Sequence, residues 1–199
     1  MSYRMDMYTI KWTRLQAEIF RFLSIKAGQS LNLRGIARPL KMSPTAVSHA
    51  LNDLEKEGFV KIKKAEKMNL LSIEFNRDNQ KAIELKRVEN LKLIYESGLA
   101  KFLEEIFPGC TVILFGSYSR GEDYFGSDGD IWVDKGEGYR SDIDIAIIGS
   151  KEKHVKLTEF DKKLERTINI NFYPSFKDIH KHLRDNILNG IVLSGSVDL

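Results

Sequence analysis

Residues 43–64, SPTAVSHALNDLEKEGFVKIKK, restrict the fold of this 199-residue chain more than any other segment. They open with serine and proline, a pair typical of the cap and first position of a helix. After Gly58, apolar residues alternate with lysines, as in a strand with one exposed face. Between these signals, apolar residues recur at helical spacing, namely Ala46, Val47, Ala50, Leu51 and Leu54. The segment therefore predicts a helix that ends at Gly58 and leads into a β-strand.

Two helices are expected before this segment and a second strand after it. Residues 33–40 form a short helix with Asn32 as its cap, and residues 71–75 alternate as a strand. Residues 14–26 form a longer helix whose apolar face holds Leu15, Ile19, Phe22 and Leu23. Three helices and a two-stranded wing in this order resemble the winged helix-turn-helix family. The resemblance covers about residues 12–76, so we assign residues 1–76 to this domain.

The resemblance implies that the third helix enters the major groove of double-stranded DNA. Charge agrees with this, since residues 1–67 hold 13 Lys and Arg against 6 Asp and Glu, while the other residues hold 18 against 22. Winged helices also bind other proteins, and that alternative stays open. The residues expected to contact DNA are Thr45, Ser48, His49 and Asn52 on the helix and Lys61 and Lys63 in the wing.

A long helix is expected to join two halves of the chain. An apolar stripe recurs every three or four residues, a break is expected near Gly98, and Pro108 ends the helix. The stripe holds Leu85, Val88, Leu91, Tyr95, Leu99, Phe102 and Ile106. We assign residues 77–107 to this segment. It serves either as a linker or as the dimerisation helix of a homodimer that reads palindromic DNA.

The second half begins with an apolar strand, CTVILFGS, which stops at Gly116 and Ser117. A short helix follows, and a later strand, SDIDIAIIGS, opens with Asp142 and Asp144. Side chains two apart in a strand face the same side, so both carboxylates converge on one point. A hard cation such as Mg²⁺ relieves the repulsion between two such groups. This arrangement predicts a site for a divalent cation and a phosphate.

The same residues resemble the nucleotidyltransferase superfamily that includes DNA polymerase β, and especially its minimal members. The resemblance covers residues 108–199 and implies an α/β domain with a mixed sheet. It also implies that Gly116, Ser117 and Arg120 bind a nucleoside triphosphate. Asp142 and Asp144 would be catalytic and would hold Mg²⁺ or Mn²⁺. The implied reaction transfers a nucleoside monophosphate to a hydroxyl of a protein, a nucleic acid or a small molecule.

Two departures from that family pattern leave alternatives open. Asp128 and Asp130 lie at the usual distance from Ser117, although Gly129 between them would weaken a strand. We favour Asp142 and Asp144, with Gly126 to Arg140 as an inserted hairpin or loop. In addition, the family's third carboxylate is replaced by Asn169 or Asn171, and an amide cannot act as a general base.

Together these patterns predict an α+β chain of two domains with a linker helix. The leading interpretation is a magnesium-dependent nucleotidyltransferase with a DNA-binding domain, and whether it is an enzyme is left undecided. The alternative is a DNA-binding transcriptional regulator whose degenerate nucleotidyltransferase domain senses a nucleotide. No apolar run reaches the roughly 20 residues that span a bilayer, and the single cysteine, Cys110, excludes a Cys-rich zinc site. A cytoplasmic protein with no membrane partner is expected.

Overall fold

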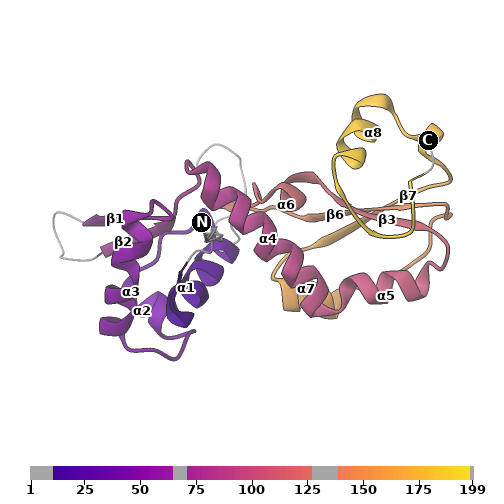
Figure 1. The fold of residues 1–199 in the computed structure, drawn as a ribbon. Coiled ribbons are helices and arrows are strands. Elements are labelled where there is room, and N and C mark those ends of the chain that lie inside the picture. Colours follow the sequence, from indigo (N-terminus) through magenta and orange to yellow (C-terminus); the bar gives the residue numbers. More distant parts are fainter. Residues whose placement is uncertain (1–10, 65–70, 127–138, 198–199) are drawn as a thin grey trace, which may run out of the picture.

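The computed structural model describes residues 11–64, 71–126 and 139–197. Its elements form two halves on either side of helix α4, Gln80–Ser97 (Figure 1). The half that precedes α4 is mainly helical, and the half that follows it is built on a four-stranded sheet. The α+β prediction is therefore confirmed. Within the described residues, no helix is both long and apolar enough to cross a membrane.

The N-terminal half contains the three predicted helices, each capped by a side chain. Thr13 and Gln16 form a capping box at the start of α1, Asn32 caps α2, and Ser43 caps α3 in front of Pro44. Gly58, with a φ of +76°, follows α3 and permits the turn into the wing. The bounds are α1 Arg14–Ile25, α2 Leu33–Ala37 and α3 Pro44–Lys56.

Two antiparallel strands, β1 Val60–Lys64 and β2 Leu71–Phe75, form the wing. A backbone bridge between Leu31 and Ile73 fixes the wing to the segment before α2, with N···O distances of 2.9 and 2.7 Å. Beneath the wing, Phe20 packs with its ring centroid 5.7 Å from those of Phe59 and Phe75. This arrangement confirms the predicted winged helix.

The joining segment is two helices, α4 and α5, Leu99–Ile106. They meet at Gly98, whose φ of +83° confirms the predicted break. Over α4 the predicted apolar stripe is not buried within this chain, because Val88 is 60% exposed and Tyr95 is 52% exposed. The buried face of α4 instead holds Ala82, Lys86, Asn90 and Ile94. Lys86 and Asn90, the two polar residues on this face, form hydrogen bonds with the C-terminal half. These bonds allow polar side chains at buried positions where apolar residues would be expected.

The C-terminal half is a mixed sheet of strand order β7-β6-β3-β8. β3 is antiparallel to both its neighbours, and β6 and β7 are parallel. The mixed sheet agrees with the prediction, while its assignment to a polymerase β-like fold stays a prediction. The strands are β3 Thr111–Phe115, β6 Ile143–Ile148, β7 Ile168–Tyr173 and β8 Ile191–Ser194.

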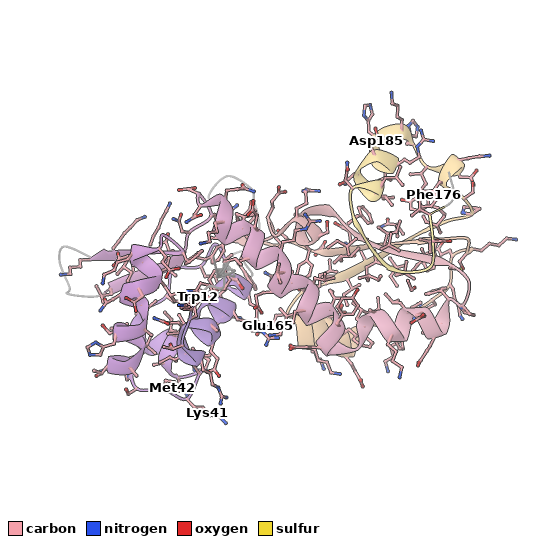
Figure 2. All side chains as sticks on the ribbon, in the orientation of Figure 1. Trp12, Lys41, Met42, Glu165, Phe176 and Asp185 are labelled. Atoms are coloured by element: carbon pink, nitrogen blue, oxygen red, sulfur yellow. The ribbon has the colours of Figure 1, made fainter. Side chains whose placement is uncertain are left out.

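Helices cover both faces of this sheet (Figure 1). Ile143, Ile145 and Ile147 pack on the side of α5 and α7, whereas Ala146 and Ile148 pack against η1 and α8. Figure 2 labels Phe176 on η1 and Asp185 on α8, both on the latter side. The bounds are α7 Thr158–Leu164, η1 Phe176–Asp178 and α8 Lys181–Leu188.

The connection between β3 and β6 starts with helix α6, Gly116–Arg120, and contains two short antiparallel strands, β4 Phe125–Gly126 and β5 Tyr139–Arg140. Their pairing agrees with the expected inserted hairpin. Asp128 and Asp130, the alternative acidic pair, lie outside the described residues.

Candidate functional site

Gly116 and Asp144 lie against each other where β3 and β6 meet. Phe115 pairs with Asp144 across the two strands, so the turn into α6 faces that carboxylate. A Cβ built on Gly116 would lie 2.5 Å from Oδ2 of Asp144, and Gly116 has a φ of +75°. Both facts require a glycine here. The structure therefore brings together two of the residues predicted to form the site.

Asn169 completes this group from the neighbouring strand. The parallel register places Asn169 beside Asp144 and Asn171 beside Ala146. Nδ2 of Asn169 donates a hydrogen bond of 2.9 Å to Oδ2 of Asp142. Of the two asparagines proposed for the position of the family's third carboxylate, Asn169 is thus the one that contacts the acidic pair.

The two carboxylates influence each other. The pKa of Asp144 is raised above its ordinary value, first by partial burial and second by the charge of Asp142, and the Asn169 amide partly offsets this. A cation between the two carboxylates would relieve both effects, and the donors present are the oxygens that Mg²⁺ or Mn²⁺ prefers. No group of three His, Cys, Asp or Glu suited to a metal occurs among the described residues. Two carboxylates alone would leave most of the coordination positions of such a cation to waters or other ligands.

Helix α6 places the other two predicted phosphate-binding residues at different positions. Ser117 follows Gly116 directly, in the first turn of α6. Arg120 lies at the opposite end of α6, where Nε contacts Glu122 at 2.7 Å and a terminal nitrogen donates to Asn186 on α8 at 3.0 Å. Its side chain is therefore already bonded, and a role in phosphate binding stays a prediction.

A groove of about 560 Å³ runs beside Asp144 along the edge of β7. It is lined by Asn169 and Asn171 on one side and by the segment that includes Glu152 and His154 on the other. The sequence analysis did not single out His154 as a site residue. Its place in this groove depends on how residues 150–157 fold back along β7, which no local pattern encodes.

The predicted DNA-contacting residues lie on the outer surface of the N-terminal half. Thr45, His49 and Asn52 are exposed and Ser48 is partly exposed, on the side of α3 opposite its buried residues. In the wing, Lys61 is ion-paired with Asp78, whereas Nζ of Lys63 lies 4.0 Å from Glu74. The side chains on α3 are thus free to meet a nucleic acid, and Lys63 is held only loosely.

A buried set of charged residues lies between the halves and was missed by the sequence analysis. We call Lys86, Asn90, Asp123 and Arg166 the interdomain polar cluster; each is at most 3% exposed. Asp123 accepts hydrogen bonds from the other three. Burial lowers the pKa of Lys86 to about 8, against the opposing attraction of Asp123. No local pattern marked it, because Lys86 and Asn90 lie outside the apolar stripe that the sequence predicts.

Comparison with known proteins bears on the N-terminal half. Residues 15–61, which span most of α1 to the start of β1, match the family described as bacterial regulatory protein, arsR family. The N-terminal domain is therefore a winged helix-turn-helix domain that is similar to the arsR family of bacterial regulatory proteins. The match ends at residue 61, so it says nothing about the C-terminal half.

Solved structures of bacterial regulators show weaker likenesses. A mutant form of ZitR from Lactococcus lactis is 24% identical with a TM-score of 0.38, over 49% of this chain and 64% of that chain. This chain therefore spans less than two thirds of that regulator. AdcR of Streptococcus pyogenes is 20% identical with a TM-score of 0.39, over 51% and 71%. The MepR–DNA complex of S. aureus is 18% identical with a TM-score of 0.35, over 48% and 81%. None of the curated proteins is a significant match.

Proposed function

We propose that this protein is a DNA-binding transcriptional regulator whose C-terminal domain binds a nucleoside triphosphate together with one divalent cation. The observation that carries the proposal is the exposed polar face of α3 in a domain that matches a family of regulators. The acidic site supplies the effector half of the proposal.

The DNA-binding half rests on geometry and charge. Val47, Leu51 and Leu54 bury one side of α3, which leaves the other side for base edges. Hydroxyl, imidazole and amide groups on that side can donate to and accept from bases, and wing lysines can contact phosphates. We expect the protein to read a specific duplex and to use the wing for salt-dependent affinity.

The effector half rests on Gly116, Asp142 and Asp144. The contact between Gly116 and Asp144 brings the start of α6 next to a carboxylate, which suits a phosphate bridged by a cation. The cation would supply charge neutralisation. The chain's own residues would position the triphosphate: Gly116 by its close backbone approach and Ser117 by its hydroxyl.

Sensing is favoured over catalysis because of Asn169. Its amide already donates to Asp142, and an amide cannot accept the proton of an attacking hydroxyl at neutral pH. Transfer of a nucleoside monophosphate to a hydroxyl acceptor stays the second candidate. It is favoured by the same contact of Gly116 with Asp144, the arrangement expected of an active nucleotidyltransferase.

DNA binding is tested by selecting a duplex from a random library with the full-length protein and measuring its dissociation constant by fluorescence anisotropy. Asn52→Ala should weaken binding about five- to 150-fold, as expected for a lost base contact. Lys63→Ala should weaken binding to all sequences and reduce the salt slope by about one. Lys101→Ala is the matched control, because Lys101 is an exposed lysine on α5. Selection that enriches no sequence would contradict a sequence-specific regulator.

The effector is tested by titrating ATP, GTP, CTP and UTP separately, each with Mn²⁺, by calorimetry. Asp142→Asn should abolish cation-dependent binding if the acidic pair is the site. Incubation with α-labelled nucleotides and cell extract then separates the two candidates. Binding without transfer supports the sensor, and transfer of label to an acceptor supports the nucleotidyltransferase.

A further inference from the structure

The interdomain polar cluster is held together by the carboxylate of Asp123. One of its oxygens accepts from Nζ of Lys86 and from Nδ2 of Asn90, the latter at 2.6 Å, and the other accepts from Arg166 at 3.1 Å. Lys86 and Asn90 come from α4, Asp123 follows α6, and Arg166 precedes β7. A buried carboxylate shared in this way fixes three chain segments relative to one another.

The cluster extends into the DNA-binding domain through Arg166. Its guanidinium donates to the carbonyl of Ile25, the last residue of α1, at 2.9 Å and lies 4.0 Å above the ring centroid of Phe125. The backbone N–H of Phe125 donates to the carbonyl of Ala27 at 2.7 Å. Gly28 packs so tightly on Phe125 that a Cβ there would overlap its carbonyl oxygen.

A second contact closes the same boundary. Lys26 is ion-paired with Glu165, the neighbour of Arg166 in sequence. Figure 2 shows Glu165 at the junction between the two halves. The end of α1 is therefore bound to the segment that leads into β7.

The cluster also reaches both sides of the acidic site. Asn90 donates to the carbonyl of Tyr118 in α6 at 2.9 Å, which ties α6 to α4. Tyr124, next to Asp123, exchanges hydrogen bonds of 3.1 and 3.0 Å with Ser141, the residue before Asp142.

On the other side of the cluster, Thr167 follows Arg166 and accepts from the backbone N–H of Ile143 at 2.8 Å. Ile143 lies between Asp142 and Asp144 in sequence. The segments that carry α6, the two aspartates and Asn169 are thus each within a few residues of the cluster.

We propose that this cluster couples the acidic site to the DNA-binding domain, so that a nucleotide and cation bound at Asp142 and Asp144 change the affinity of the protein for DNA. The inference rests on the proposed function. Any ligand that favours one arrangement of α6 and β6 acts on Asp123 and Arg166, and through Ile25 and Phe125 on α1. Because α1 packs directly on α3, the position of the recognition helix relative to the rest of the protein changes with it.

Thermodynamic coupling of this kind is reciprocal. If the nucleotide changes the dissociation constant for DNA by some factor, DNA changes the dissociation constant for the nucleotide by the same factor. Factors of about five to 150 are typical of coupled sites. Arg166 and Phe125 are positioning residues in this proposal, since neither contacts the nucleotide or the DNA.

The test uses the full-length protein, the selected duplex and each of the four nucleoside triphosphates with Mn²⁺. The dissociation constant for the duplex is measured with and without nucleotide. The dissociation constant for the nucleotide is measured with and without duplex. Wild type should show a change of at least about fivefold, equal in both directions. Arg166→Lys keeps a charge beside Asp123 but loses the planar contact with Phe125, and should reduce the change to less than about twofold while the duplex is still bound.

Two further variants separate coupling from folding. Phe125→Leu should also reduce the change to less than about twofold, with its folding verified by thermal denaturation. Arg21→Lys is the matched control, because Arg21 also links α1 to α4, through Glu89 and Glu96, but lies outside the cluster. It should keep the full change.

The outcomes separate this inference from the proposed function. A wild-type protein that binds no duplex overturns both. Duplex binding that no bound nucleotide alters, or the absence of any nucleotide binding, overturns the inference and leaves DNA binding intact. Arg166→Lys and Phe125→Leu variants that keep the wild-type change would also overturn it.

Discussion

Replacing Asp123 with asparagine removes the negative charge from the interdomain polar cluster while keeping the size of the side chain. Lys86 is 0% exposed and Arg166 is 3% exposed, so both cations would lose their buried counter-charge. Removing one partner from a buried ion pair costs about 3–5 kcal/mol, because the other charge stays in a medium of low polarity. We expect a loss of at least about 3 kcal/mol in the free energy of unfolding.

Urea denaturation followed by circular dichroism measures this loss, and thermal unfolding supports it. For a chain of this length, about 3 kcal/mol corresponds to a decrease in Tm of about 6–12 °C. Asp53→Asn is the matched control, since Asp53 also bonds a side-chain amide and a lysine but is 57% exposed. It should cost less than about 1 kcal/mol.

A double variant isolates the electrostatic cause. Adding Lys86→Met to Asp123→Asn removes a positive charge that the single variant leaves unpaired, so the double variant should be more stable than Asp123→Asn. An Asp123→Asn loss below about 1 kcal/mol, or a double variant whose loss equals the sum of the two single losses, would refute the electrostatic reasoning.

The lysine of the cluster, the turn at Gly116 and the amide of Asn169 each allow a separate measurement. Because the pKa of Lys86 falls from 10.5 to about 8 on folding, the unfolded chain binds more protons than the folded chain between these pH values. This group therefore makes the protein more stable as pH rises from about 8 to 10.5. Urea titrations should show that the free energy of unfolding depends less on pH in Lys86→Met than in wild type. Gly116→Ala should weaken nucleotide binding in calorimetry at least about tenfold and lower stability by about 1–2 kcal/mol, because its Cβ would lie 2.5 Å from Asp144 and its φ is positive; unchanged binding would exclude this turn from the site. Asn169→Asp adds a third carboxylate, so Mn²⁺ should raise the Tm of this variant more than that of wild type, and equal shifts would exclude residue 169 as a potential ligand.

Local patterns were sufficient to predict the N-terminal domain. The predicted caps, Asn32 and Ser43, act on the backbone of the next few residues, and the alternation after Gly58 indicates which side of the strand is buried. The spacing of Asp142 and Asp144 was likewise a local signal, since it predicts that both side chains face the same side where β6 begins. The break at Gly98 was equally local, because it depends on one residue's freedom to adopt a positive φ.

Only the tertiary structure decided which residues of α4 are buried and which asparagine meets the acidic pair. Periodicity predicted an apolar stripe through Val88 and Tyr95, yet within this chain Lys86 and Asn90 are the buried residues, because Asp123 offers both of them a buried partner. This partner is distant in sequence, and its approach depends on how the domains pack. Asn169 was likewise selected by the register of two parallel strands. The spacing of apolar residues along a helix or strand indicates which side of that one segment is buried. Charge pairing and strand register depend instead on which segments, distant in sequence, come together in the fold.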